Sequence, residues 1–321
     1  MPNILVLVNP ISGRGNGAKS FPIIENYLKS MAGASGRTLE YKLQFTQRVG
    51  QAIELAEAAA GEGYDVVAAA GGDGTANEVL NGLARACLSG NAGKPMPAMG
   101  ILPVGRGNDF AFGAGIPHDL EVACRILVEG KRHPIDVGHA VGGDYPRGRY
   151  FGNGVGIGFD TVVGFEALKL KRLSGFPSYI VAALKTIFLY FNAPLLQIET
   201  LDPQGNPRTL TQPCLMVSIM NGRRMGGGFM MAPEGKMDDG AFDLCIAGKI
   251  SRPAVLGLIP RFMKGSQAGH PAIKFLRAAK VSVKALEGSL PAHADGETLC
   301  KAGAQLELSL HPGLLEIMGP A

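Results

Sequence analysis

The sequence predicts two domains of different class, an α/β domain followed by an all-β antiparallel domain. Up to Gly138, apolar strand patterns alternate with helical patterns, which is typical of a parallel sheet covered by helices. Beyond Gly138, short strand patterns separated by turns dominate, and this indicates an antiparallel β domain. The chain of 321 residues is long enough to bury two cores. We place the linker between the halves near residues 138–148.

The composition is that of a folded globular protein, with 46% hydrophobic and 18% charged residues. A formal net charge of +4 is too small to indicate nucleic acid binding, but it suits an anionic substrate or a membrane surface. The five cysteines lack C-x-x-C spacing and support neither a zinc site nor a disulfide framework. No signal peptide precedes the first strand, and the most apolar window, residues 179–191, is too short to span a bilayer. We therefore expect a cytoplasmic protein.

The first strand, residues 4–8, runs into a glycine-rich loop that begins at Asn9 and ends at Gly17. The loop lacks the G-x-x-x-x-G-K-[ST] spacing of a P-loop. It could supply backbone donors and Arg14 to a nucleotide, or it could be a flexible connection to a helix. The local residues leave both interpretations open. An alternating pattern over residues 39–45 then predicts a half-buried strand ending at Thr46, followed by a helix.

A buried strand at residues 66–70 ends in three glycines around one carboxylate, and a helical pattern follows at once. Strand, glycine turn and helix together direct N–H groups and the positive end of a helix at an anion. Gly71, Gly72 and Gly74 carry no Cβ that would block a phosphate. Because Asp73 would repel a bare phosphate, its presence indicates that Mg²⁺ accompanies the phosphates.

A capping box is the alternative interpretation of this stretch. Thr75 and Glu78 have the Thr-x-x-Glu spacing that closes the start of many helices with no ligand. That spacing does not explain the glycines, since an ordinary strand-to-helix turn needs at most one of them. We therefore favour a loop that handles phosphate.

A third glycine-bearing loop follows the apolar strand at residues 98–104 and contains Gly105, Arg106, Gly107, Asn108 and Asp109. A capped helix at residues 119–130 and a strand at residues 135–138 complete the first half. In an open α/β sheet the carboxyl ends of the strands form the binding crevice. Three such loops at one edge predict a binding site there.

The second half begins with glycine alternating with apolar residues over residues 150–159. The phasing is wrong for a dinucleotide fingerprint, so we predict a strand with close backbone approaches. Residues 165–191 are mostly helical, with Lys169, Lys171 and Arg172 followed by aromatic residues that include Tyr190; such helices lie on a membrane or, more commonly, pack on a core. Short strands follow at residues 196–201, 214–220, 242–246, 280–286 and 305–310, with one helical insert at residues 253–265.

Two carboxylate clusters lie in this half. The turn from Lys236 to Asp243 could bind a hard cation, but an Asp239-Gly240 hairpin explains it on local chemistry alone. The second cluster contains Asp295 and Glu297. A kinase that acts on an alcohol needs a carboxylate to receive the hydroxyl proton. If the two domains form a cleft, either Asp295 or Glu297 is placed to be that base.

In chain order, these motifs resemble the bacterial diacylglycerol-kinase-type lipid kinases, a family similar to sphingosine kinases and more distantly to NAD kinases. The resemblance runs from about residue 3 to the C-terminus. The motifs that carry it are Asn9-Pro10 with Ser12-Gly13, Thr46, Gly71 to Thr75 with Asn77-Glu78, Leu102-Pro103 with Gly105 and Asn108 to Ala111, Asp239-Gly240, and Asp295-Gly296-Glu297.

The resemblance implies a Rossmann-like domain at residues 1–138, joined by a return segment at about residues 311–321, and a β-sandwich domain at residues 139–310. It implies ATP between the domains, Asp73 acting with Mg²⁺, and Glu297 as the proton acceptor with Asp295 beside it. A structural Mg²⁺ is implied on the Asp239 carboxylate and the carbonyls of Lys236 and Ala241. The implied nucleotide site comprises Asn9, Ser12, Gly13, Arg14, Gly15, Thr46, Gly71, Gly72, Asp73, Gly74, Thr75, Glu78, Gly105, Arg106, Asn108 and Asp109.

One residue departs from the family pattern, because Arg106 stands where threonine is usual. We expect its guanidinium to pair either with acids such as Asp109 and Asp136 or with phosphate. The sequence as a whole predicts an ATP- and Mg²⁺-dependent kinase of a lipid such as diacylglycerol, acting in phospholipid metabolism and transiently bound to the membrane surface. Alternatives are a kinase of a soluble alcohol such as NAD and an inactive nucleotide-binding regulator. The identity of the lipid and the oligomeric state, a homodimer included, stay open.

Overall fold

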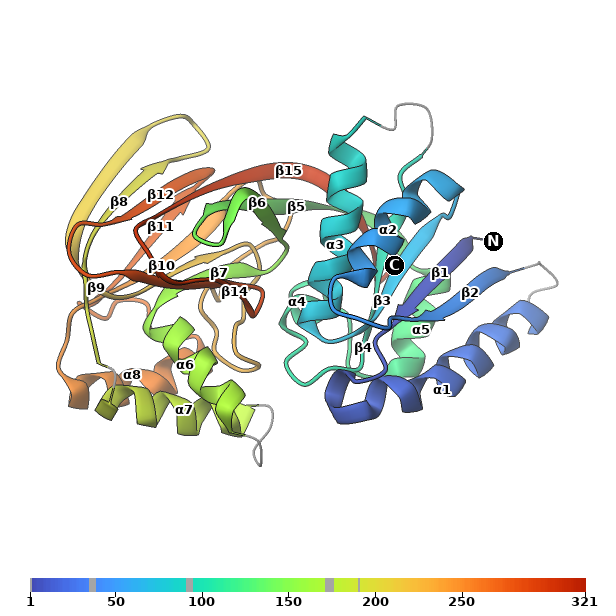
Figure 1. Cartoon of the computed structure of the whole chain (residues 1–321), viewed down its shortest axis with the longest axis horizontal. Helices are drawn as coiled ribbons and strands as arrows, with labels where there is room; N and C mark the ends of the chain where they lie inside the picture. Colours follow the sequence, from blue (N-terminus) through green and yellow to red (C-terminus); the bar gives the residue numbers. More distant parts are fainter. Residues whose placement is uncertain (1, 35–38, 91–94, 171–175, 190) are drawn as a thin grey trace. The chain divides into compact units, whose positions relative to one another are not determined.

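The computed structural model describes residues 2–34, 39–90, 95–170, 176–189 and 191–321. The chain divides into two compact units (Figure 1). Unit 1 comprises Met1–Val137 and Gly313–Ala321, and unit 2 comprises Gly138–Pro312. The α/β and antiparallel β classes predicted for the two halves are confirmed, as the following elements show.

Unit 1 is built on a parallel sheet with the strand order β2-β1-β3-β4. The strands are β1 (Asn3–Val8), β2 (Glu40–Phe45), β3 (Val66–Gly71) and β4 (Ala98–Pro103). Both β3 and β4 are buried along their whole length, as their continuous apolar runs predict. The C-terminal part of β15 (Gln305–Gly319) extends this sheet, because its Ile317 pairs in parallel with Met99 of β4.

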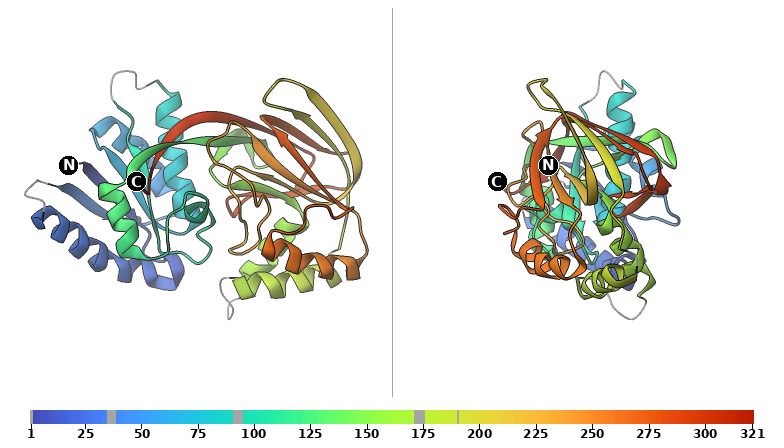
Figure 2. Two further views of the ribbon diagram at one scale, coloured as in Figure 1. Left: turned by 180° about the vertical axis from the view of Figure 1, so that it is seen from behind. Right: turned by 90° about the vertical axis from the view of Figure 1, so that its left-hand side faces the viewer.

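Five helices follow the strands of unit 1: α1 (Ser12–Ala34), α2 (Gln51–Glu62), α3 (Asp73–Leu88), α4 (Asp109–Gly113) and α5 (Leu120–Glu129). The predicted cap of α5 is confirmed, since the Asp119 carboxylate accepts the N–H groups of Glu121 and Val122. Helix α2 packs on α3, and α1 packs on α5. The two pairs cover opposite faces of the sheet (Figures 1 and 2).

Unit 2 is an antiparallel β-sandwich. One sheet contains β8 (Leu195–Leu201), β9 (Pro207–Met220), β12 (Lys280–Ala285) and β15, and the other contains β7 (Gly154–Gly158), β9, β10 (Phe242–Gly248), β11 (Ile273–Ala278), β13 (Leu290–Ala294) and β14 (Glu297–Gly303). Strand β9 belongs to both sheets, pairing with β8 before Cys214 and with β7 and β10 after it. The core lies between the sheets, where Phe151 stacks on Phe242 with ring centroids 5.5 Å apart.

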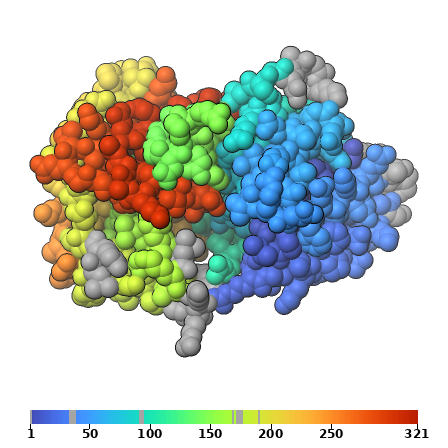
Figure 3. All heavy atoms as spheres, in the orientation of Figure 1, coloured from blue at the N-terminus to red at the C-terminus, as the bar shows by residue number. Residues whose placement is uncertain are grey.

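A hairpin of β5 (Lys131–Gly142) and β6 (Tyr145–Phe151) precedes the sandwich. Its turn packs on β14, where the Asp144 N–H donates to the carbonyl of Leu299 at 2.8 Å. In the space-filling view, the green atoms of this hairpin lie against the red atoms of the C-terminal strands (Figure 3). The prediction of a single strand over residues 150–159 is wrong. The strand is interrupted at Gly152 and Asn153, and a helix begins at Phe159.

Three helices lie against the outer face of the second sheet: α6 (Phe159–Lys169), α7 (Phe176–Leu189) and α8 (Arg252–Lys264). A methionine-rich cluster that includes Met216, Met220 and Phe262 fills the layer beneath them. The predicted helical insert is confirmed by α8. The predicted basic residues Lys171 and Arg172, and Tyr190, lie outside the described residues. In the described part of the chain, no helix is long and apolar enough to cross a membrane.

Candidate active site

The loop between β3 and α3 presents an open helix N-terminus. Helix α3 begins at Asp73, and its N-cap residue Gly72 is extended and makes no side-chain cap hydrogen bond. The capping-box interpretation is therefore wrong, since Thr75 lies inside the helix and its hydroxyl accepts the Asn9 side-chain amide at 3.0 Å. An uncapped helix start, with its N–H groups and positive dipole, is suited to a phosphate.

Glycines allow the neighbouring loops to touch this helix start through their backbones. A Cβ on Gly71 would lie 2.3 Å from the Thr75 hydroxyl, and one on Gly105 would lie 2.3 Å from the Gly72 Cα. The N–H groups of Val104 and Gly105 both donate to the carbonyl of Gly71, at 3.0 and 3.1 Å. Larger residues would push these loops apart, which explains why the sequence places glycine here.

The Asn9 loop joins the same edge of the sheet. The Asn9 N–H donates to the carbonyl of Ala70 at 3.0 Å, and a Cβ on Gly13 would lie 2.4 Å from the carbonyl oxygen of Val104. Gly13, Arg14 and Gly15 are all left-handed, with φ of 58°, 61° and 91°. The Thr46 N–H donates to the carbonyl of Val8 at 2.9 Å and brings the end of β2 alongside. The structure therefore gathers the three predicted loops and Thr46 at one edge of the unit 1 sheet.

Two carboxylates approach one another within this edge. Asp73 Oδ1 accepts the Phe110 N–H at 3.0 Å. A Cβ on Gly107 would lie 2.7 Å from Asp73 Oδ2 and 3.7 Å from Asp109 Oδ2, so both oxygens border the space that this glycine leaves open. Carboxylate oxygens are the ligands that Mg²⁺ prefers, and Mg²⁺ is commonly held by one or two carboxylates together with substrate phosphates. Asp73 and Asp109 therefore fit a magnesium ion that arrives with a nucleotide.

The loop that carries Arg106 is held by its neighbour Asn108. Asn108 is buried and left-handed, with φ of 52°, and its side-chain amide donates to the carbonyl of Gly105 at 3.1 Å. Arg106 itself is exposed and forms no ion pair with any residue that the structure describes. Of the two kinds of partner expected for Arg106, the acids among the described residues form no ion pair with it.

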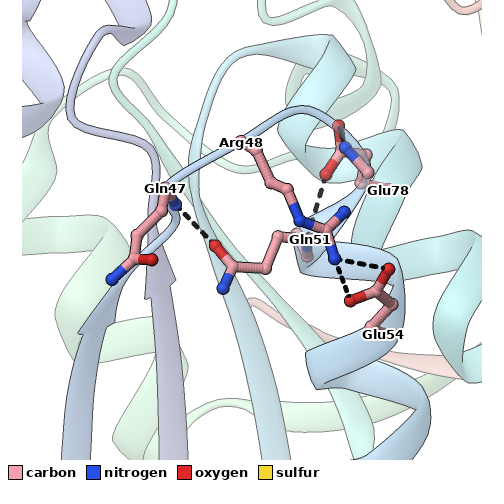
Figure 4. A network of polar contacts seen from close by, with 7 residues as sticks. Gln47, Arg48, Gln51, Glu54 and Glu78 are labelled. Carbon is pink, nitrogen blue, oxygen red and sulfur yellow. Dashed lines mark hydrogen bonds and ion pairs between the residues drawn. The ribbon is translucent and has the colours of Figure 1, made fainter.

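Glu78 lies beside the turn that carries Arg48 and leads into α2 (Figure 4). Its carboxylate accepts the N–H groups of Gly50 at 2.8 Å and Ala52 at 3.1 Å, at the start of α2. Gly50 is the N-cap of α2 and has no side chain to cap it. Arg48 and Glu54 pair at 2.6 Å on the surface of the same turn, and this contact lowers the pKa of Glu54. Glu78 therefore fixes the turn that follows Thr46.

In unit 2, the β13–β14 turn holds the predicted acids. Ala294 pairs with Glu297 across a two-residue turn in which both Asp295 and Gly296 are left-handed, the pattern of a type I′ hairpin. The Asp295 carboxylate accepts three N–H groups, from Gly152 at 2.8 Å, Asn153 at 3.0 Å and Gly154 at 2.9 Å. The Glu297 side chain is partly exposed, and its carboxylate makes no hydrogen bond or ion pair to the described residues. Asp295 anchors the turn, and Glu297 keeps an available carboxylate.

The sequence did not indicate a polar cluster beneath α6. Ser218 donates to Asp160 Oδ2 at 3.1 Å, and a Cβ on Gly156 would lie 2.5 Å from Asp160 Oδ2 and 2.6 Å from His293 Nε2. Asp160 keeps some surface exposure as a residue, but burial of its carboxyl group raises the pKa to about 7. Burial lowers the pKa of His293 to about 4. The glycine repeat around Gly156 was the available signal, because Gly154 and Gly156 leave space for side chains from other elements.

The aspartate turn, for which the resemblance implies a structural Mg²⁺, holds Asp239 in an ion pair. Asp239 Oδ2 accepts the Arg277 guanidinium at 2.5 Å, and Arg277 Nε lies 3.7 Å from Asp243 Oδ1. The carboxylate is therefore already paired with a positive charge.

Comparisons with known proteins agree with this arrangement of domains. The diacylglycerol kinase catalytic domain matches residues 3–140, and the YegS C-terminal NAD kinase beta sandwich-like domain matches residues 153–319. A diacylglycerol kinase from Staphylococcus aureus (strain bovine RF122 / ET3-1) is 29% identical over 294 residues, covering 91% of this chain and 85% of the relative. The diacylglycerol kinase of S. aureus strain MRSA252 shows the same identity and coverage.

Solved structures share the fold. The crystal structure of a diacylglycerol kinase from Bacillus anthracis str. Sterne superposes with a TM-score of 0.72 at 21% identity, covering 99% of this chain and 96% of that one. A second crystal structure from the same organism gives a TM-score of 0.76 at 23% identity, covering 99% and 97%. With both of its domains matched, the chain belongs to the family of bacterial diacylglycerol-kinase-type lipid kinases.

Proposed function

We propose that the protein is an ATP- and Mg²⁺-dependent kinase that transfers the γ-phosphoryl group to the hydroxyl of a lipid such as diacylglycerol. One observation carries the proposal. Three loops meet, backbone against backbone, at the uncapped start of α3, with the Asp73 and Asp109 oxygens bordering the same space. The named activity of the S. aureus relatives, diacylglycerol kinase, supports the choice of acceptor.

The unit 1 loops would hold the nucleotide mainly through backbone. The N–H groups at the start of α3 and the left-handed segment Gly13 to Gly15 would contact phosphate oxygens. Arg106, exposed and without an ion-pair partner among the described residues, would add a permanent positive charge. Asp73 and Asp109 would hold a Mg²⁺ ion, which would supply positive charge next to the phosphates of the ATP that donates the phosphoryl group.

Glu297 would act as the base. A carboxylate that is partly exposed, and that bonds to no described residue, is free to accept the proton that the lipid hydroxyl loses as its oxygen becomes phosphorylated. Asp295 would be a positioning residue, because its three backbone hydrogen bonds fix the turn from which Glu297 projects.

The test is a kinase assay with labelled ATP on Asp73→Asn and Glu297→Gln variants, with Glu287→Gln as the control. Glu287 is an exposed glutamate of the same unit, so its replacement should leave the rate unchanged. We expect both active-site variants to lose at least about 100-fold in kcat while keeping the wild-type circular dichroism spectrum. Normal turnover by Glu297→Gln would remove that residue from the mechanism.

The acceptor is identified in the same assay by offering diacylglycerol, phosphatidylglycerol, a sphingoid base and NAD in parallel. Preferential labelling of a lipid supports the proposal. Labelling of NAD alone would replace it with a soluble-alcohol kinase. ATP binding with no labelled product from any acceptor would indicate a nucleotide-binding regulator.

A further inference from the structure

Helix α7 carries an apolar stripe on the side that faces away from the rest of unit 2. Its buried residues Ala182, Ala183 and Ile187 pack on α6, β9 and α8. The opposite side exposes Val181 (41%), Leu184 (39%) and Phe188 (61%). These three positions follow the i, i+3, i+7 spacing that places side chains on one face of a helix. Three large apolar side chains are therefore presented together.

Helix α8 lies beside α7 (Figures 1 and 2) and also exposes apolar side chains. Leu256 and Met263 of α8 are exposed at 36% and 43%. We call the exposed residues Val181, Leu184, Phe188, Leu256 and Met263 the α7–α8 face.

The charges on these two helices have a single sign. Neither Phe176–Leu189 nor Arg252–Lys264 contains an aspartate or glutamate, although the chain has 27 of them. Arg252, Arg261 and Lys264 of α8 are exposed, and none of them forms an ion pair within the part of the chain that is described. The Arg252 guanidinium lies 5.7 Å from the ring centroid of Phe191. Lys185 of α7 is paired with Glu166 of α6 at 2.5 Å, so the unneutralised cations beside these exposed apolar side chains are those of α8.

We propose that the α7–α8 face docks on an anionic lipid bilayer. The stripe would enter the headgroup boundary, and the cations of α8 would contact anionic headgroups. A second copy of this chain fits the face poorly, because a two-fold interface would bring the same cations together with no acid opposite them. The inference deepens the proposed function and rests on it, since it identifies the surface on which a lipid-phosphorylating enzyme would meet its substrate.

The docking is tested by co-sedimentation of the full chain with large vesicles of phosphatidylcholine alone and of equimolar phosphatidylcholine and phosphatidylglycerol. We expect stronger binding to the anionic vesicles, and weaker binding as salt is added. The triple variant Val181→Ser, Leu184→Ser, Phe188→Ser should bind at least about tenfold more weakly. The double variant Arg261→Glu, Lys264→Glu should lose the preference for anionic vesicles.

The matched control is the double variant Phe275→Ser, Leu286→Ser, which removes two exposed apolar side chains from unit 2 outside the α7–α8 face. It should bind vesicles as the wild type does. Wild-type binding by the triple variant would overturn the proposal. The proposal would also be overturned if analytical ultracentrifugation showed a dimer that is lost only in the triple variant, because the face would then join two copies.

A kinase assay separates this inference from the proposed function. With a short-chain diacylglycerol in detergent micelles, the triple variant should keep kcat/KM within about twofold of the wild type, whereas on vesicles its rate should fall in step with its binding. If the wild-type protein binds anionic vesicles but phosphorylates no lipid in micelles, the proposed function fails and the docking surface stands. If micellar activity is normal and vesicle binding is absent, the docking proposal alone fails.

Discussion

The carboxyl group of Asp160 makes the stability of unit 2 depend on pH. Burial raises its pKa to about 7, whereas an unfolded aspartate titrates near pH ~4. Between these values the folded chain holds a proton that the unfolded chain releases. Its contribution to stability is therefore fully present below about pH 4 and is lost as the pH rises through about 7.

Asp160→Asn should remove this dependence, because the amide cannot ionise and its oxygen can still accept from Ser218. We expect the difference in unfolding free energy, variant minus wild type, to increase by roughly 2–4 kcal/mol as the pH rises from ~5 to ~8. Urea denaturation across this range measures the difference. His293, whose lowered pKa acts in the opposite sense as the pH falls, is present in both chains and cancels.

The control for this comparison is Asp202→Asn. Asp202 lies in an exposed turn, where hydrogen bonds from Asn206 lower the pKa of its carboxyl group. A lowered pKa acts only below the ordinary aspartate range, so this variant should run parallel to the wild type from pH ~5 to pH ~8. Parallel curves for Asp160→Asn as well would show that the carboxyl group is not held in its neutral form.

Individual residues differ in how far the sequence reveals them. Gly71, Asp73 and Gly105 could be identified because a glycine next to a carboxylate after a strand reports on backbone geometry within a few residues. Asp160 and His293 could not, since both side chains border Gly156 only when α6 packs on β7 and β13. The Arg277–Asp239 pair was missed for the same reason, because its partners come from a strand and a turn that are distant in sequence.

Among the elements, the β13–β14 hairpin turn is held by contacts to another segment. Asp295 is buried and left-handed, and its carboxylate accepts three N–H groups from the segment between β6 and β7. Because these N–H groups bond to Asp295, the strand predicted over residues 150–159 forms in two pieces. The Asp-Gly pattern predicts the hairpin itself, but no local pattern predicts what the aspartate bonds to.

Asp295→Ala should leave three buried N–H groups without an acceptor and force alanine into a left-handed conformation. We expect a loss of about 2–5 kcal/mol in unfolding free energy, measured by urea denaturation. Asp295→Asn, which tolerates the left-handed conformation and keeps one acceptor oxygen, should lose less. Under the proposed mechanism, kcat should fall more than KM rises, because Glu297 is displaced.

A matched aspartate turn provides the control. The Asp202 carboxylate also accepts backbone N–H groups, from Gln204 at 2.9 Å and Asn206 at 2.8 Å, but it lies in an exposed hairpin. Water can replace those bonds, so Asp202→Ala should destabilise far less and leave kcat unchanged. Equal losses at the two turns would show that burial of the Asp295 bonds contributes nothing.

At the scale of the whole molecule, the sequence shows the two fold classes and their order more clearly than the path of the chain. The α/β and antiparallel patterns have different periods, and their change near Gly138 is local information. The C-terminal segment is different, because residues 313–321 belong to unit 1 although they are far from it in sequence. Periodicity gave no indication of this, and only the family resemblance implied it.

Deleting residues 313–321 should therefore unfold unit 1 while unit 2 stays folded. Leu315, Ile317 and Met318 are buried, and Ile317 pairs with Met99 at the edge of β4. Removing three buried side chains costs about 5–9 kcal/mol, which is comparable with the total stability of a typical domain. Hydrogen exchange should show loss of amide protection in β4 and β3, with β9 and β10 still protected. Deletion of the exposed Ala321 alone should change neither unit. Full protection of β4 in the shortened chain would mean that the parallel sheet is complete without β15, and that the C-terminal segment contributes little to the domain that carries Asp73.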